Sequence, residues 1–338
     1  MRGKESTLDM LRCIPFYKKI WQEAASLNQA SFLELEEGIW KVDFAGESTL
    51  INNFKVQIDN PVILDIAGNK GLCYRLFTES GLPVPEYQVL NVYRLEEAKK
   101  FMIKNSGSFF VVKPSRGTSG SRGITTHIRS FQECCRAGAL ASLYGDEMIV
   151  ERLIAGESYR LLVLDGKMIH ATRRQGFRIK GDGQSTIWQL IEKENKSRQM
   201  KKLKNIVLDR DLEATLQAQG LGKESIPGVG QKVLIKSYDF PKGIGSEVRT
   251  IFNENVTDLV CQDLITHSVR AAGILNSKFA GVDIITLDPT KPLRETGGAI
   301  IEINTTPGLH HHYNLMNEQN PPPALYVLRH LLKFSNGA

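Results

Sequence analysis

The segment Gly297–Tyr313, GGAIIEINTTPGLHHHY, constrains the possible structure of this chain more than any other stretch. Its centre has the apolar character of a short buried strand, yet it contains Glu302 and Asn304. Because side chains alternate across a strand, these two project from one face, while Ile301 and Ile303 project from the other. An ionised carboxylate buried without a partner costs several kcal/mol, so we expect Glu302 to meet a cation or a metal ion.

A second apolar strand, GVDIITLD, lies upstream and has Asp283 at its start. Asp283, Glu302 and Asn304 would offer three oxygen donors from adjacent strands, a set that suits Mg²⁺ held together with nucleotide phosphates. This arrangement suggests a Mg-ATP site. The two strands alone leave an alternative open, in which Asp283 and Glu302 only cap strands or pair with surface lysines.

Length and composition indicate an ordinary globular protein. With 338 residues and 41% hydrophobic composition, the chain can form two or three subdomains. The net charge of +6 comes from interspersed basic residues and does not argue for nucleic acid. No stretch approaches the ~18 apolar residues of a membrane span, and the amino terminus lacks a long apolar core, so we expect a cytoplasmic protein without a membrane partner. The five cysteines include no C-x-x-C pair, and we expect reduced thiols.

The first ninety residues have the pattern of a leading α/β subdomain. Periodicity predicts a helix over Phe16–Leu35, a strand pair over Gly38–Phe54 and a short strand over Pro61–Ile66. A helix over Lys70–Ser80 is then closed by Gly81. This helix carries two cations, Lys70 and Arg75, whose default role is to be solvated.

A glycine-rich loop follows the strand Ser108–Lys113. Its sequence, PSRGTSGSRGITTHI, combines glycines, which let backbone N–H groups approach an anion, with hydroxyl donors. It matches neither the P-loop nor the Rossmann pattern, and a flexible turn is the alternative. Lys113 favours a phosphate-covering loop, because a lysine at the end of the entering strand is placed to meet phosphate.

The chain continues with a capping box, Ser130 and Glu133, that opens a helix over Phe131–Leu143. The strand EMIVERLI comes next, and its residues 150–153 can offer backbone groups to a planar base. A hairpin then turns at residues 165–166. We expect this hairpin to bring three arginines to one side of the sheet, where guanidinium groups suit carboxylate and phosphate: Arg160, Arg173 and Arg174.

The remaining segments are less informative. We expect helices over Ser185–Ser197, from a cap at Asp211 to Gly220, over Thr257–Leu275, and after the prolines near the carboxyl end. The polar loop SYDFPKGIGSEVR is either a surface excursion or a substrate loop. The histidines 310–312 are adjacent and point in different directions, so we favour a substrate-contacting loop over a zinc site.

The order of these motifs resembles the ATP-grasp superfamily. The motifs are VVKP, the glycine-rich loop, MIVERLIAGESYRLLV, ATRRQ, KGDGQSTIWQLIEKEN, GVDII and IIEINTTPG. The segment RRQGFRIKGDGQSTIWQLIEKEN in particular resembles the ATP-grasp module of cyanophycin synthetase and its stand-alone peptide-ligase relatives. The similarity runs from about Val62 to Tyr313. The Mur-ligase-like half of cyanophycin synthetase has no counterpart here, so we expect that the chain is not the full polymerase.

The resemblance implies an α+β fold of three α/β subdomains, with ATP between the central and carboxyl-terminal ones. Their expected ranges are 1–90, 91–153 with the glycine-rich loop, and 154–338 with the metal ligands. Lys113 would touch the adenine side and the α- and β-phosphates, residues 117–123 would cover the β- and γ-phosphates, and Glu151 with the backbone near Leu153 would meet adenine. The full implied nucleotide set is Lys70, Arg75, Lys113, Gly117, Ser119, Gly120, Gly123, Glu151, Leu153 and Glu157.

The resemblance also implies the metal and substrate residues. Asp283, Glu302 and Asn304 would bind two Mg²⁺ ions, for which Mn²⁺ is an alternative. Arg160 and Arg173, beside Arg174, would hold the carboxylate substrate or the transferring phosphoryl group. Two further residues would line the substrate end, namely Gly308 and His310.

Two positions depart from the family pattern. The family usually has an acid for the ribose where Ser158 stands, so Glu157 would need a shifted backbone to serve. The leading helix normally supplies a lysine for phosphate, but Tyr74 or Arg75 stands there and Lys70 lies one turn away. The identity of the cation that contacts ATP therefore stays open.

The implied activity is that of an ADP-forming carboxylate-amine ligase acting on amino acids or peptides in specialised peptide biosynthesis. A substrate carboxylate would attack the γ-phosphate of ATP, and an amine would then displace phosphate from the acylphosphate. Two alternatives stay open: loading of an amino acid on a carrier-protein thiol, and an inactive ATP-binding regulatory protein. Relatives are often dimers or tetramers, which implies a homodimer.

Overall fold

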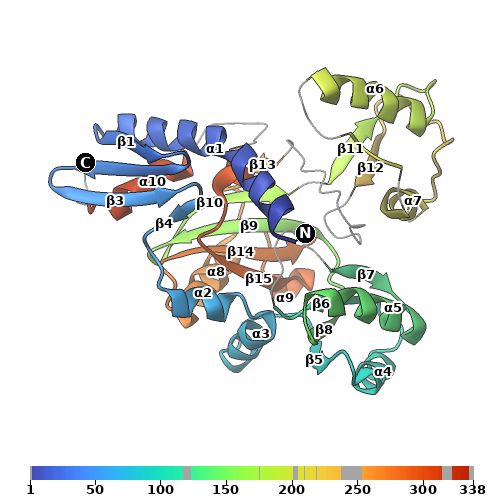
Figure 1. The fold of residues 1–338 in the computed structure, drawn as a ribbon. Helices are drawn as coiled ribbons and strands as arrows, with labels where there is room; N and C mark the ends of the chain where they lie inside the picture. The colour runs from blue at the N-terminus through green and yellow to red at the C-terminus, as the bar shows by residue number, and fades with distance from the viewer. Residues whose placement is uncertain are drawn as a thin grey trace.

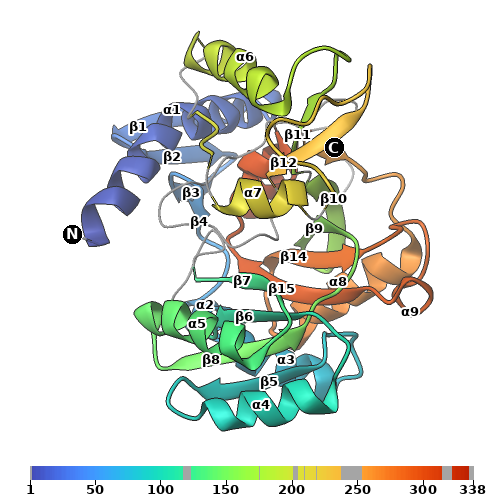
Figure 2. The ribbon, with the colours of Figure 1, turned by 90° about the vertical axis from the view of Figure 1, so that its right-hand side faces the viewer.

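The computed structural model describes residues 2–116, 123–174, 176–200, 205–208, 210–217, 219–236, 253–313 and 322–334. The described chain contains four β-sheets with helices packed on them (Figures 1 and 2). The fold is the mixed α/β architecture that the sequence led us to expect. Of the helices in the described ranges, none has the length and apolar character needed to cross a bilayer.

An amino-terminal layer is built on a four-stranded antiparallel sheet of order β1-β2-β3-β4. The long helix α1 and the late helix α10 pack together beside it (Figure 1). Their shared core includes Trp21 and Trp40, both completely buried, and it continues into Leu162 of the large sheet. The elements are α1 (Arg2–Leu27), β1 (Ser31–Glu36), β2 (Ile39–Phe44), β3 (Glu47–Asn52), β4 (Lys55–Val56) and α10 (Pro323–Leu331).

Two sequence-based predictions in this region were wrong, one of a helix boundary and one of an element type. The helix expected over Phe16–Leu35 ends at Leu27, and Ser31–Glu36 pairs as strand β1. The strand expected over Pro61–Ile66 is helix α2 (Pro61–Ala67). Asn60 caps α2 by accepting from the Ile63 N–H, and Pro61 fits the first helical turn because its missing N–H would have no helical partner there.

The helix predicted near residue 70 is confirmed as α3 (Lys70–Glu79). Asn69 caps it by accepting from the Leu72 N–H, and Gly81 follows with a φ of +70°. The predicted strand pair over Gly38–Phe54 is likewise confirmed, as β2 and β3.

The central unit is an antiparallel sheet of order β5-β8-β6-β7, covered on one face by α4 and α5 (Figure 2). The predicted capping box is present: Ser130 Oγ accepts from the Glu133 N–H, and the Glu133 carboxylate accepts from the Ser130 N–H. The elements are β5 (Tyr87–Asn91), α4 (Leu95–Lys104), β6 (Phe110–Pro114), β7 (Thr125–Ile128), α5 (Phe131–Ala141), η1 (Ser142–Tyr144) and β8 (Glu147–Arg152).

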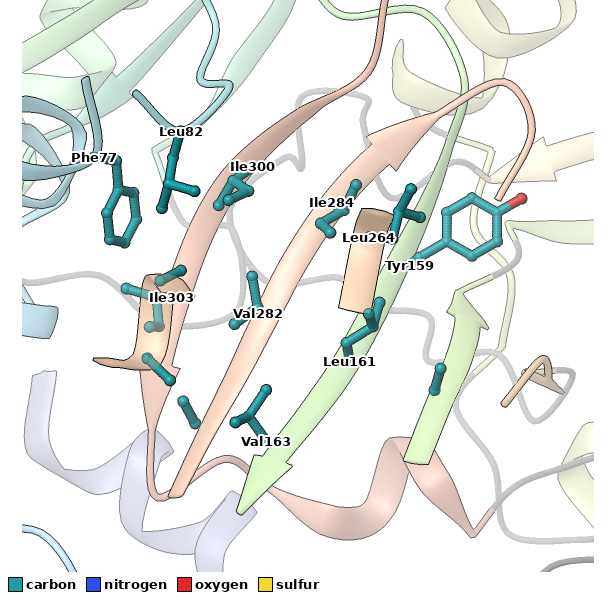
Figure 3. Close-up of a cluster of buried hydrophobic side chains, with 14 of the residues drawn as sticks. Phe77, Leu82, Tyr159, Leu161, Val163, Leu264, Val282, Ile284, Ile300 and Ile303 are labelled. Atoms are coloured by element: carbon teal, nitrogen blue, oxygen red, sulfur yellow. The ribbon is translucent and has the colours of Figure 1, made fainter. Parts of the chain in front are cut away.

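The largest sheet has the order β13-β10-β9-β14-β15. Helix α8 covers one face, where Leu161, Val282, Ile284 and Ile303 form an apolar core (Figure 3). The predicted hairpin turn at residues 165–166 joins β9 to β10. The elements are β9 (Glu157–Leu164), β10 (Lys167–Arg174), β13 (Glu254–Asn255), α8 (Gln262–Ile274), β14 (Phe279–Thr286), α9 (Leu293–Thr296), β15 (Ala299–Thr305) and η2 (Leu309–His312).

A small unit with its own apolar core follows β10 in the chain (Figure 1). Strands β11 and β12 pair antiparallel, and Ile191 and Leu212 are among the buried side chains between them and the helices. Asp211, the expected cap, lies within the second helix. The elements are β11 (Phe177–Lys180), α6 (Ile187–Met200), α7 (Arg210–Gln217) and β12 (Lys232–Lys236).

Candidate active site

Strand register brings an arginine and two carboxylates into one row across the large sheet. Asp283 lies in the middle of β14, opposite Arg160 of β9 on one side and Glu302 of β15 on the other. Directly opposed residues of neighbouring strands project from the same face. The row therefore lies on the face opposite to the α8 core. Asp283 does not stand at the start of its strand, as the sequence suggested, but at its fifth residue.

Asp283 is held by two arginines. Arg160 donates from Nε to Oδ1 and from Nη2 to Oδ2, each at 2.6 Å, and Arg174 Nη1 lies 3.3 Å from Oδ2. Only 1% of Asp283 is exposed. Burial alone would raise its pKa, but the charge and hydrogen bonds of Arg160 and the charge of Arg174 outweigh burial, so the pKa lies below its ordinary value. Asp283 is thus an ionised carboxylate inside a low-dielectric site.

Glu302 is only partly buried, with 30% of its side chain exposed, but it does meet the counter-charge that the sequence led us to expect. Lys70 Nζ, from the first turn of α3, lies 3.3 Å from Glu302 Oε1. The expectation that Lys70 is solvated is therefore wrong, since its side chain is only 8% exposed. Arg75 of the same helix is exposed. Lys70 is accordingly the leading-helix cation that faces the carboxylate row.

Asn304 follows Glu302 by two residues and shares its face. Its amide nitrogen is buried, and in the described part of the chain it has no hydrogen-bond partner. An unsatisfied buried amide is costly, so such a group is a candidate for contact with a ligand.

Lys113 enters the same region from the central sheet. Its Nζ lies 2.9 Å from Glu151 Oε2, donates to Tyr74 Oη at 2.9 Å and reaches the Ile301 carbonyl at 3.3 Å. Tyr74 in turn donates to the same carbonyl at 2.9 Å. These contacts connect α3, the central sheet and β15. Burial and then the charge of Glu151 raise the pKa of Tyr74 well above its ordinary value, so its hydroxyl stays protonated.

Of the glycine-rich loop, Gly117, Ser119 and Gly120 lie outside the described residues. Gly123 is described, with a φ of +73°. A Cβ at this position would lie 2.8 Å from Pro114 Cγ and 2.8 Å from the Tyr144 ring. Both the conformation and the space therefore call for glycine at the end of this loop.

The three arginines do not share one face, and this expectation is corrected. Arg174 lies two residues from Thr172, which opposes Arg160, so both arginines project toward Asp283. Arg173 instead opposes Tyr159, a member of the α8-side core. Neighbouring residues of a strand alternate between faces, so Arg173 faces away from the carboxylate row.

Arg173 belongs to a separate ion-pair cluster. It binds Glu254 and also Glu157 Oε2, the latter at 3.2 Å. Arg178 of β11 lies 3.1 Å from Glu157 Oε1. Glu157, the expected substitute for a ribose acid, is therefore held by two arginines on the far side of the sheet, and Ser158 is buried. The sequence offered no signal for the roles of Glu254 and Arg178.

The segment predicted to meet adenine joins the two sheets. Glu151 is 5% exposed and is the partner of Lys113. Leu153 is half-buried, and its N–H donates to the Phe109 carbonyl at 2.8 Å.

The substrate-end residues pack against α1. Tyr17 Oη and His310 Nδ1 are 2.9 Å apart, and a Cβ at Gly308 would lie 2.7 Å from the His310 ring. His312 Nδ1 lies 3.0 Å from His170 Nδ1 of β10. Sequence reasoning missed Tyr17 and His170, because contacts this distant along the chain have no local signature.

Among the described residues, no three His, Cys, Asp or Glu side chains lie together as ligands for a metal ion. Asp283, Glu302 and Asn304 form a different kind of set, two carboxylates and an amide on adjacent strands. A carboxylate has about four lone-pair positions, so Asp283 can accept from Arg160 and still offer an oxygen to a cation. Oxygen-only donors of this type suit Mg²⁺. The residues present therefore fit the ion.

Comparisons with known proteins agree with this architecture. No family model matches the chain. It is 34% identical to cyanophycin synthetase from Trichormus variabilis over 255 residues, which is 74% of this chain and 27% of that protein. It is 24% identical over 289 residues to the glutathione biosynthesis bifunctional protein GshAB from Clostridium perfringens, covering 83% of this chain and 35% of that protein. The chain thus spans about a quarter to a third of the length of these relatives.

A solved structure extends the similarity to the fold. The bifunctional glutathione synthetase from Pasteurella multocida aligns with 90% of this chain and 41% of its own, with a TM-score of 0.59 and 20% identity. The chain therefore has the ATP-grasp fold, and over 255 residues it is similar in sequence to one part of cyanophycin synthetase.

Proposed function

We propose that this protein is an ADP-forming ligase that joins the carboxylate of an amino acid or peptide to an amine through an acylphosphate. The observation that carries the proposal is the row Arg160–Asp283–Glu302, with Arg174 and Lys70 beside it. Arginine and carboxylate side chains thus share one sheet face, with a lysine of helix α3 beside them. Neutralisation of phosphate charge at fixed positions is what phosphoryl transfer requires.

The proposed nucleotide site is bounded by the central sheet and β15. Lys113 bridges the two, and its ion pair with Glu151 fixes the ammonium group. In our proposal Lys113 and Lys70 bind phosphate oxygens, while the backbone around Leu153 meets the adenine. In the free protein Lys70 forms an ion pair with Glu302. A bound phosphate would share the Lys70 ammonium group with that carboxylate.

Mg²⁺ would be held by Asp283, Glu302 and Asn304 and would supply charge neutralisation for the phosphates. Arg160 and Arg174 would orient the transferring phosphoryl group or the substrate carboxylate through their N–H donors. The substrate carboxylate oxygen attacks the γ-phosphorus, and ADP leaves with the electrons of the broken bond. An amine then attacks the acyl carbon, and phosphate leaves. We further propose that the site binds two Mg²⁺ ions and that the protein is a homodimer located in the cytoplasm.

The first test measures ADP release from Mg-ATP against a panel of amino acids and dipeptides, singly and in pairs. Glu302→Ala is the active-site variant. Glu47→Ala is its matched control, because Glu47 also pairs with a lysine, Lys333, but on the surface of the amino-terminal layer. We expect release that needs two substrates, a condensed product by mass spectrometry, and a loss on the order of 10²-fold or more in Glu302→Ala alone.

Stabilisation by Mg-ATP in a thermal melt, without ADP release for any pair, would count against the ligase and favour an ATP-binding regulatory protein. If a product formed only with a carrier protein and was a thioester, the acceptor would be a thiol and not an amine.

A further inference from the structure

The turn after β15 passes directly over the arginine of the active-site row. A Cβ placed on Gly281 would lie 2.9 Å from Pro307 Cβ and 3.4 Å from Arg160 Cδ. Pro307 therefore packs on β14 beside Arg160. The next residues form η2, which packs against β10, the strand that carries Arg174. Helix η2 thus follows a turn that packs beside Arg160, and it lies against the strand that carries Arg174.

These three histidines have different surroundings. His310 bonds to Tyr17 of α1, and His312 bonds to His170 of β10. The His311 ring packs on the His310 ring with centroids 4.1 Å apart. Asn253 Nδ2 donates to the backbone carbonyl of His311 at 2.9 Å, but among the described residues we find no hydrogen bond to the His311 ring.

His311 is a neutral imidazole beside positive charge. It is 8% exposed. Burial, then the charges of His310, Arg174, Arg160 and His312, lower its pKa well below the ordinary value. Asp283 balances part of the arginine charge. The ring therefore has a lone pair that can accept a proton, and no partner in the described chain uses it.

We propose that His311 is the general base that accepts the proton from the attacking amine. The proposal rests on the ligase function above. The amine nitrogen forms a bond to the acyl carbon, the bond from that carbon to the phosphate oxygen breaks, and phosphate leaves with its electron pair. The proton released from the nitrogen passes to a ring nitrogen of His311.

The neighbouring arginines make this step dependent on the bound anion. In the free protein their charge disfavours a protonated His311. A phosphoryl group bound to Arg160 and Arg174 adds negative charge close by, which favours the imidazolium. The basicity of His311 therefore rises when the acylphosphate is in place. General base catalysis contributes typically about 10²–10⁴-fold in rate.

The test compares two acceptors in wild type, His311→Gln and His311→Asn. One acceptor is the amine that supports condensation in the panel. The other is hydroxylamine, which is largely unprotonated at neutral pH and traps acylphosphates as hydroxamates without needing a base. His330→Gln, on α10, is the matched control. Product is quantified by mass spectrometry, and thermal melts check that each variant folds.

We expect the His311 variants to lose about 10²-fold or more in condensation with the amine while they keep hydroxamate formation within a few-fold. Their condensation rate should also rise with pH toward the pKa of the free amine, where wild type is flat. Equal losses with both acceptors, or none with either, would overturn the role of His311. A wild type that gives neither hydroxamate nor amide with any panel carboxylate would overturn the ligase function itself.

Discussion

Buried neutral histidines should make this protein less stable in mild acid, and His170 allows the effect to be calculated. His170 is 2% exposed, and burial lowers its pKa from 6.5 to about 4. Between these two values the unfolded chain binds a proton that the folded chain does not. The free energy of unfolding therefore stays unaffected by this group above about pH 6.5 and falls as the pH decreases toward 4.

The size of the effect follows from the two pKa values. Proton linkage gives a loss of about 2 kcal/mol between pH 7 and pH 5, and about 3 kcal/mol by pH 4. His170→Gln removes the titration but keeps a polar group that can bond to His312 Nδ1. The loss between pH 7 and pH 5 should therefore be about 2 kcal/mol smaller in the variant than in wild type.

The assay is urea unfolding at 25 °C at several pH values, followed by tryptophan fluorescence. Trp21 and Trp40 are buried in the core that includes Leu162, the residue opposite His170, so they report on the unfolding of this region. Comparison of wild type with variant cancels the titrating groups that do not contact His170. Parallel curves for wild type and His170→Gln would refute the reasoning.

Three further predictions follow from single contacts. Ser130→Ala should lower the free energy of unfolding by about 1 kcal/mol in urea titrations, because it removes half of the capping box. Gly156→Ala should destabilise by more than about 1–3 kcal/mol or prevent folding, since Gly156 has a φ of +133° and its Cβ would lie 2.3 Å from the Thr286 carbonyl carbon; expression and thermal melts measure this. Arg160→Ala should reduce ADP release on the order of 10²-fold or more, while Arg173→Ala, on the opposite sheet face, should leave it within about 10-fold.

Much of the fold could be predicted because local signals and tertiary structure agree. The alternation over Glu302, Ile303 and Asn304 in β15, the turn between β9 and β10 and the capping box at Ser130 each depend on residues close in sequence. The segment Pro61–Ile66 shows where this fails. Its short apolar run fits a buried strand as well as a helix, and the cap by Asn60 decides the matter.

The sequence could predict which types of side chain form the candidate site, but not which of them contact one another. The sequence indicated that Glu302 needs a counter-charge, but it could not select Lys70 from the other cations, because the pair joins residues on different elements. Lys113 was placed correctly at the end of a strand entering the loop, yet its contacts with Tyr74 and Ile301 arise only when α3 packs on β15.

Register explains why three arginines so close in sequence serve different faces. Arg173 and Arg174 are adjacent in sequence, and the sequence around them does not show which of the two faces the carboxylate row. The pairing of β10 with β9 sets Thr172 opposite Arg160, and this one alignment turns Arg174 toward Asp283 and Arg173 toward Glu254. A shift of one residue would exchange the two. Ala171 of β10 opposes such a shift, because it packs in the α8 core and a one-residue slip of β10 would turn it to the other face. The hydrophobic pattern of a strand thus determines which arginine reaches the proposed phosphate site.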